Sequence, residues 1–174
     1  MENRKIYKIS VIGDDGVGKK TFLNKYGLQG VQTIGLDVYQ KNINFENTSW
    51  IINIWVIPQN HRYGSIKDLH QGSKCAILMY DICKAESFIN LHKYITEFTE
   101  VNQGKFLNFV VIGNKNDKRD ETCLPVDDGI KFAKELSDWL GREVPYYDVS
   151  VLNDDLEFIF LDIIKGIQSL EKLY

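Results

Sequence analysis

Residues 6–26 read IYKISVIGDDGVGKKTFLNKY, and this stretch decides the fold class. Its first part, Ile6 to Ile12, has the apolar, β-branched composition of a buried strand. A glycine-rich turn follows at once and matches the pattern GxxxxGK between Gly13 and Lys19, and a helical segment then runs from Lys20 to Tyr26. A strand, a glycine-rich loop and a helix in this order indicate a phosphate-binding loop.

The residue types in this loop suit phosphate chemistry. Glycines let the backbone curl so that successive N–H groups converge on phosphate oxygens, with the positive end of the helix behind them. Lys19 would reach the β- and γ-phosphates as a mobile charge. The alternative, a strand-to-helix turn that binds nothing, is disfavoured by the agreement of motif, position and order. The predicted nucleotide-contacting residues here are Asp15, Gly16, Val17, Gly18, Lys19, Lys20 and Thr21.

The rest of the chain alternates apolar runs with helical patterns, which predicts an α/β fold with a largely parallel sheet. Cys75 to Tyr80 and Phe106 to Ile112 are nearly continuous apolar runs, as expected of strands buried on both faces. Val38 to Phe45 and Trp50 to Ile57 flank a polar turn and predict a hairpin. The last helix is predicted to begin near Asn153-Asp154, whose side chains suit an N-cap. No repeat or linker interrupts the pattern, so we expect one domain over residues 1–174.

The composition excludes several classes of protein. Lys and Arg number 21 against 24 Asp and Glu, a net charge of -3, which offers no electrostatic surface for nucleic acid or anionic membrane. The charged start is unlike a signal peptide, and no apolar run approaches the length of a membrane span. Cys75, Cys83 and Cys123 are odd in number and lack CxxC spacing, so we expect reduced thiols in a cytosolic setting, neither a disulfide nor a zinc site.

A second motif, NKND from Asn114 to Asp117, directly follows the predicted strand at 106–112. A carboxylate at this place can accept two hydrogen bonds from the N1 and exocyclic amine edge of guanine, an arrangement that adenine does not offer. The motif alone is weak, because Asn and Asp are common turn residues. Both motifs fall at carboxyl ends of strands, where open α/β sheets bind ligands, and together they are specific.

With these motifs the sequence resembles the Ras superfamily, and most closely its Rab branch. The phrases KISVIGDDGVGKKTFLNKY, TIGLD, INIW, GNKND and DVS stand in Rab-like order over nearly the whole chain. The resemblance implies a P-loop NTPase fold, with a six-stranded, mostly parallel sheet that has one antiparallel edge strand and about five flanking helices. It also implies that the protein binds GTP and GDP.

The resemblance also implies roles by position. Lys19 would hold phosphates, Asn114 and Asp117 the base, and Lys115 the face of the ring. Ser150-Val151 would meet the base carbonyl through backbone N–H groups, and Thr33 matches the switch threonine that senses the γ-phosphate through magnesium.

The departures from the family fall on magnesium and hydrolysis. Lys20 stands where the family has a magnesium-ligating Ser or Thr, and Thr21 does not simply substitute, because one helical step turns a side chain by roughly 100°. The family's DxxG reads Val56-Ile57-Pro58-Gln59, and Asn60, a weak candidate for placing water, replaces the glutamine that follows it. We therefore expect impaired or absent GTP hydrolysis and doubtful use of Mg²⁺.

Lys20 carries a sharper hypothesis, in which its ammonium lies where magnesium would and partly neutralises the phosphates. The alternative is a solvated lysine on the first helical turn. For the whole chain we expect a guanine-nucleotide-binding protein that acts through protein effectors or regulators. Its rivals are a nucleotide-free interaction scaffold and a slow GTPase completed by a partner, while NKND argues against a small P-loop kinase.

The expected location is cytoplasmic, with attachment to membranes only through partners. The chain ends Glu171-Lys172-Leu173-Tyr174 without the prenylated cysteines of Rab proteins, so no direct membrane anchor is expected within it. Either a prenylated tail has been removed from this sequence, or the protein is not lipid-anchored by that route.

Overall fold

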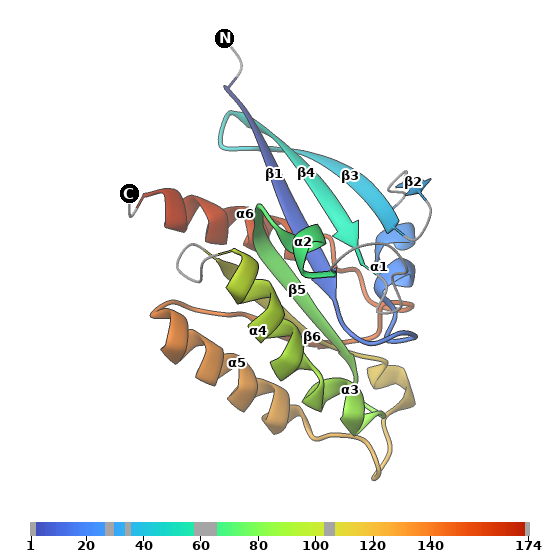
Figure 1. Cartoon of the computed structure of the whole chain (residues 1–174). Helices are drawn as coiled ribbons and strands as arrows, with labels where there is room; N and C mark the ends of the chain where they lie inside the picture. Colours follow the sequence, from blue (N-terminus) through green and yellow to red (C-terminus); the bar gives the residue numbers. More distant parts are fainter. Residues whose placement is uncertain (1–2, 27–29, 34–35, 58–65, 103–106, 173–174) are drawn as a thin grey trace.

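A computed structural model describes residues 3–26, 30–33, 36–57, 66–102 and 107–172 of the chain. Strands and helices alternate along it in the manner expected (Figure 1). Among the described residues, no helix has the length and apolar character needed to cross a membrane. The elements are β1 (Asn3–Ile12), α1 (Lys19–Lys25), β2 (Gly30–Thr33), β3 (Leu36–Phe45), β4 (Thr48–Val56), α2 (Ile66–His70), β5 (Ser73–Asp81), α3 (Ala85–Ile89), α4 (Leu91–Val101), β6 (Asn108–Asn114), a 3₁₀ turn (Asn116–Lys118), α5 (Val126–Leu140), β7 (Tyr146–Val149) and α6 (Phe158–Glu171).

The strands form one sheet in the order β2-β3-β4-β1-β5-β6-β7. Strands β4, β1, β5, β6 and β7 pair in parallel, and β3 pairs antiparallel with β4. The predicted α/β P-loop fold is confirmed, and the predicted six strands are joined by a seventh. This is β2, which pairs antiparallel with β3 through Gly30 opposite Tyr39 and so extends the antiparallel edge.

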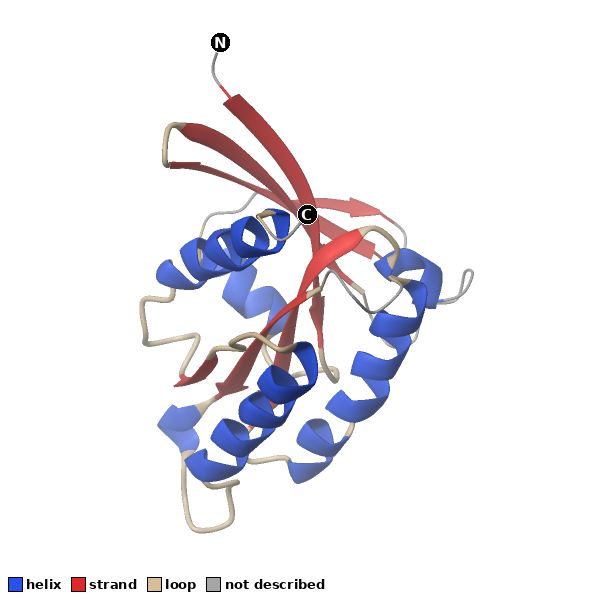
Figure 2. Cartoon of the chain, turned by 90° about the vertical axis from the view of Figure 1, so that its left-hand side faces the viewer, coloured by secondary structure: helices blue, strands red, loops and turns tan. Residues whose placement is uncertain are grey.

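Helices cover both faces of the sheet (Figure 2), so a central strand such as β5 is buried on both sides. Its residues alternate between two buried clusters: Cys75, Ile77 and Met79 face one, and Ala76, Leu78 and Tyr80 face the other. Residues of α1 and α6 complete the first cluster, and residues of α4 and α5 complete the second. This period of two in a strand buried on both sides is the reason that its sequence reads as one apolar run.

The cysteines do not all behave as predicted. Cys83, just after β5, and Cys123, before α5, form a disulfide across a separation of 40 residues, so the expectation of reduced thiols is wrong for this pair. Their loops are brought together by the sheet, since the Leu124 amide donates a hydrogen bond to the Ile82 carbonyl at 2.8 Å. Sequence spacing gives no sign of such a long-range contact. Cys75 is free and buried, and burial raises the pKa of its thiol.

The end of helix α2 is fixed to the sheet by side chains. His70 is buried, and its Nδ1 lies 3.1 Å from Ser10 Oγ, which in turn lies 2.9 Å from Ser73 Oγ. The ammonium of Lys8 donates to the Leu69 carbonyl at 2.7 Å. Burial, with a smaller effect from the nearby Lys8 charge, lowers the pKa of His70 to about 4. The imidazole is therefore neutral in the folded protein at pH 7.

This histidine makes stability depend on pH. The folded-state pKa of His70 is about 4 and the unfolded value is 6.5, so the unfolded chain binds the extra proton between these values. We expect the free energy of unfolding to be unaffected by His70 above pH 6.5 and to fall as the pH is lowered. The loss is about 2 kcal/mol by pH 5 and about 3 kcal/mol by pH 4. Urea unfolding between pH 7 and pH 5 measures it.

The matched control uses the exposed His92, which lies on α4. His70→Gln should flatten the pH dependence between pH 7 and pH 5, and His92→Gln should leave it intact. An unchanged slope in His70→Gln would show that another group causes it.

Candidate functional site

The two motifs meet at one edge of the sheet, as predicted from their positions after strands. The loop from Gly13 to Lys19 follows β1, and the segment from Asn114 to Asp117 ends β6, two strands away across β5. A cavity of about 250 Å³ opens on the loop. Its lining is Asp15, Gly16, Gly18, Lys19, Lys20, Thr21, Asp37 and Val56. This cavity contains every predicted contact of the phosphate loop except Val17, which is buried in the core.

Asn114 joins the two motifs and a third segment. Its Nδ2 donates to the Val17 carbonyl at 2.7 Å, and its Oδ1 accepts from the Val151 amide at 2.9 Å. Gly18 makes this approach possible, because a Cβ there would lie 2.3 Å from Asn114 Nδ2 and its φ is +109°. One buried side chain thus sets the distance between the phosphate loop, the NKND segment and the loop after β7.

Lys19 is buried and folds over its own loop. Its ammonium donates to the Gly13 carbonyl at 2.6 Å and to the Asp14 carbonyl at 2.7 Å, and it lies 3.9 Å from an Asp15 carboxylate oxygen. Burial lowers the pKa of Lys19, while the charges of Asp15 and Asp14 oppose that shift. The side chain is therefore held at the mouth of the loop, where a phosphate group would meet its third proton.

The outer side of the loop is attached to α4, a contact that the sequence did not predict. Asp14 accepts hydrogen bonds from Asn90 Nδ2 at 2.9 Å and from the Tyr94 hydroxyl at 2.7 Å. Burial, together with the bond to Asp14, raises the pKa of Tyr94. The carboxylate of Asp14 is thus directed away from the cavity, and that of Asp15 remains on its wall.

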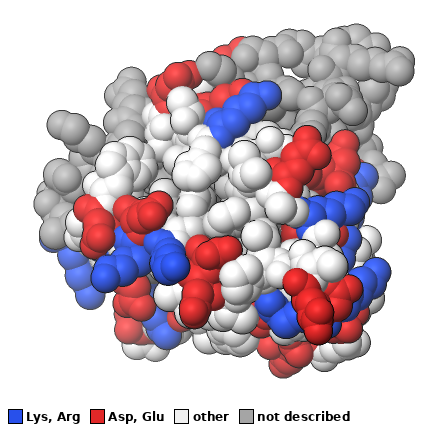
Figure 3. All heavy atoms as spheres, turned by 90° about the horizontal axis from the view of Figure 1, so that it is seen from below, with Lys and Arg blue, Asp and Glu red and all other residues white. Residues whose placement is uncertain are grey.

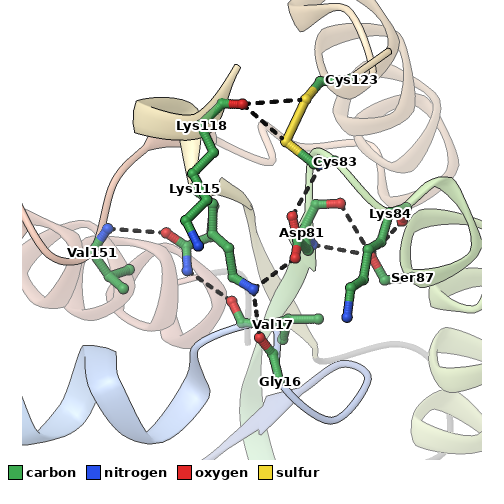
Figure 4. Close-up of polar contacts among 11 residues, drawn as sticks. Gly16, Val17, Asp81, Cys83, Lys84, Ser87, Lys115, Lys118, Cys123 and Val151 are labelled. Atoms are coloured by element: carbon green, nitrogen blue, oxygen red, sulfur yellow. Dashed lines mark hydrogen bonds and ion pairs between the residues drawn. A yellow bond between two sulfur atoms is a disulfide. The ribbon is translucent and has the colours of Figure 1, made fainter. Parts of the chain in front are cut away.

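Lys115 bridges the two motifs from above (Figure 4). Its ammonium donates to the Gly16 carbonyl at 2.7 Å and to Asp81 Oδ2 at 2.7 Å. Its backbone has φ +73°, in the left-handed region that β-branched and bulky residues rarely adopt, which aims the side chain back across β5. Asp81, at the end of β5, holds this lysine in place and belongs to no motif that the sequence analysis identified.

Asp117 is not among the residues that line the cavity. It lies in the 3₁₀ turn, where its side chain is exposed. Its carboxylate forms no hydrogen bond or ion pair with any of the residues that the structure describes. Its neighbour Asn116 is fixed, since Asn116 Nδ2 donates to the Asp148 carbonyl at 3.0 Å. The backbone that carries Asp117 is therefore anchored, and the carboxylate itself is available to a ligand.

The predicted base-carbonyl donors are already engaged. The Ser150 amide donates to Asp154 Oδ2 at 2.8 Å, and the Val151 amide donates to Asn114. By contrast, the buried Ser150 hydroxyl has no hydrogen-bond partner among the described residues. In this arrangement, a base carbonyl reaches these two amides only if Asp154 or Asn114 moves.

Two of the side chains that line the cavity, Lys20 and Val56, cannot serve as magnesium ligands. Mg²⁺ requires six oxygen ligands in near-octahedral geometry, usually with one or two carboxylates. Here Lys20 Nζ lies 2.6 Å from Asp37 Oδ2, and Val56 presents only carbon. The hydrogen bond to Asp37 raises the pKa of Lys20, so the site holds an ammonium at pH 7. No group of three acidic, histidine or cysteine side chains suited to a metal occurs among the described residues. The Thr33 side chain and Asn60 lie outside them.

Charges of both signs surround this end of the molecule. Figure 3 shows Lys and Arg interspersed with Asp and Glu among the described residues on the face that it presents.

Comparisons with known proteins point in one direction. A model of the Ras family matches residues 8–169. The chain is similar to the Ras-related protein RABG3e of Arabidopsis thaliana, at 31% identity over 92% of this chain and 81% of that protein. It is also similar to the Ras-related protein Rab-7b of Paramecium octaurelia, at 29% identity over 98% and 85%, and to the Ras-related protein Rab7 of Pisum sativum, at 31% identity over 84% and 74%.

Proposed function

This chain belongs to the Ras family, and on that premise we propose that it binds GDP and GTP without magnesium and hydrolyses GTP slowly or not at all. The observation that carries nucleotide binding is the double hydrogen bond of Asn114 to Val17 and Val151. It holds the phosphate loop and the base segment at a fixed separation before any ligand arrives. Preorganisation of this kind lowers the cost of binding.

The independence from magnesium rests on Lys20. In this proposal the ammonium of Lys20, together with Lys19, supplies the positive charge beside the β- and γ-phosphates. The pair with Asp37 orients Lys20, whose side chain is still 59% exposed along the cavity wall. An ammonium is a compact point charge with three donors, which suits phosphate oxygens.

The proposed slow hydrolysis of GTP rests on the charged residues that line the same cavity. Phosphoryl transfer depends on positioning and on stabilisation of the charge that spreads over the transferred group. Asp15, on the wall of the cavity with its side chain 61% exposed, adds negative charge where that group would lie. Lys20 is itself paired with Asp37, so the two lysine ammoniums compensate only part of the combined negative charge of Asp15 and the phosphates. We therefore expect the protein to act by binding protein partners in the cytoplasm more than by turnover.

A nucleotide-free scaffold is the second candidate function, and one observation favours it. The Ser150 and Val151 amides are satisfied within the protein, as they need to be if no base occupies the site. Asn114 and Lys19 would then act only to hold the loops together.

The deciding experiment is nucleotide content and affinity. We expect the denatured protein to release GDP or GTP on chromatography, and labelled GDP and GTP to titrate with dissociation constants that EDTA changes by less than about twofold. A loss of tenfold or more with EDTA would show that magnesium is used. No released nucleotide and no saturable titration would favour the scaffold. GTP turnover, measured with and without candidate partners, tests the slow GTPase completed by a partner.

A further inference from the structure

We propose that the Cys83–Cys123 disulfide is a thiol-reactive modification site that controls how tightly the base end of the nucleotide site is held. The inference rests on the proposed guanine-nucleotide binding and adds a regulation to it. It starts from the position of the disulfide, which joins the end of β5 to the loop after the 3₁₀ turn (Figure 4).

On one side, the disulfide is linked to the phosphate loop through a short chain of bonds. The Cys83 amide donates to Asp81 Oδ1 at 3.0 Å. The other oxygen of the same carboxylate accepts from Lys115, which also binds the Gly16 carbonyl. A shift of Cys83 therefore changes the position of Asp81, and with it the bridge between the two motifs.

On the other side, the disulfide lies against the turn that carries Asp117. The Lys118 carbonyl oxygen lies 3.5 Å from Cys83 Sγ and 3.7 Å from Cys123 Sγ. Lys118 is the last residue of the 3₁₀ turn, and Asp117 precedes it directly. The crosslink thus ties the loop after β5 to the loop that follows the 3₁₀ turn, beside the residue that precedes Lys118, Asp117. The same turn is also held by Asn116, whose Nδ2 donates to the Asp148 carbonyl, and by the ion pair of Arg119 with Asp148.

The two sulfurs are accessible in a way that the third cysteine is not. Cys83 and Cys123 are half-buried, and Cys75 has no exposed surface. A small dithiol can attack one sulfur of the pair to form a mixed disulfide, which its second thiol then resolves. The protein gains two thiols, and the dithiol becomes its own cyclic disulfide after giving up two electrons and two protons. A low-molecular-weight disulfide reverses the step.

Reduction of the disulfide should make the segment that carries Asp117 more mobile and leave the phosphate loop in place. The Asn114 bonds to Val17 and Val151 do not involve the cysteines, so the phosphate loop stays in place. The segment from Lys115 to Lys118 keeps its bonds to Gly16, Asp81 and Asp148 but loses the support of the disulfide beside Lys118, so we expect the turn that carries Asp117 to move more. We expect labelled GDP to dissociate about fivefold faster or more after reduction, the range of an ordinary coupling between sites.

The test measures GDP dissociation from the full chain before and after treatment with dithiothreitol, with the disulfide followed by alkylation and mass. The double variant Cys83→Ser/Cys123→Ser should release GDP at the fast rate and ignore the reductant. Cys75→Ala should respond as the wild type does. A bond that is reduced with less than a twofold change in rate, or a double variant that still responds, would overturn the proposal.

A second measurement separates this proposal from the proposed function. Amide hydrogen exchange over residues 115–118 should be slow in the oxidised protein and faster after reduction, with no nucleotide present. If the oxidised protein binds no GDP, the proposed function fails while this readout still tests the control of the segment. Equal exchange in both states would overturn the inference.

Discussion

Asp117→Ala is expected to weaken GDP binding by about 10²- to 10⁴-fold while leaving the fold intact. Each hydrogen bond to a charged acceptor contributes about 1.5–3 kcal/mol, and guanine offers two donors, at N1 and the exocyclic amine. The carboxylate is exposed and has no other hydrogen-bond or ion-pair partner within the described ranges, so its removal should change unfolding by less than about 0.5 kcal/mol. Titration with labelled GDP measures the first effect, and urea unfolding measures the second.

Two controls accompany Asp117→Ala: a second variant and a second ligand. Glu121→Ala removes a carboxylate from the exposed loop that follows and should leave GDP affinity unchanged. Inosine diphosphate lacks the exocyclic amine, so the wild type should prefer GDP to it by about 10- to 100-fold. Asp117→Ala should bind the two equally. A variant that keeps the preference for GDP would show that the base is read elsewhere.

The parts of the site that lie in one short segment could be predicted from the sequence. The loop from Gly13 to Lys19 and the NKND motif each follow a strand directly, and parallel strands present their carboxyl ends at one edge. The residues that hold these segments were not visible. Asp81 and Asp14 act through partners 34 and 76 to 80 residues away, at separations that no local pattern records.

The predicted start of the last helix was wrong, because the same short polar side chain suits either a helix cap or a turn. Asn153-Asp154 was expected to cap the last helix, yet α6 begins at Phe158. Asp154 instead accepts from the Ser150 amide, and its own amide donates to the Ser150 carbonyl at 2.8 Å, which closes a turn before the helix. Short polar side chains satisfy turns and caps equally well, so propensity alone could not choose. The hairpin was placed correctly, with Glu46 and Asn47 at positive φ between β3 and β4.

The double variant Lys20→Thr/Val56→Asp is expected to make GDP binding depend on magnesium. It supplies the hydroxyl and the carboxylate that the Ras family pattern has at these positions, and it releases Asp37 from the ammonium that now lies 2.6 Å away. Charge neutralisation by a bound divalent cation is worth several kcal/mol, so EDTA should weaken GDP binding to the variant by about 10²-fold. The wild type, titrated in the same buffers, should change by less than about twofold.

One further variant and a second measurement are needed, because Val56 is only 2% exposed and a buried carboxylate destabilises the fold when no cation is bound. Val56→Asn, combined with Lys20→Thr, matches the size of the aspartate without its charge and should not respond to EDTA. In the Asp variant, magnesium should also raise the melting temperature, since a ligand of the native state stabilises it. The prediction fails if magnesium changes neither the GDP affinity nor the melting temperature of the double variant. Lys20 and Val56 would then not be the reason that this chain binds nucleotide without a metal. If the wild type already loses GDP to EDTA, Lys20 does not stand in for the ion.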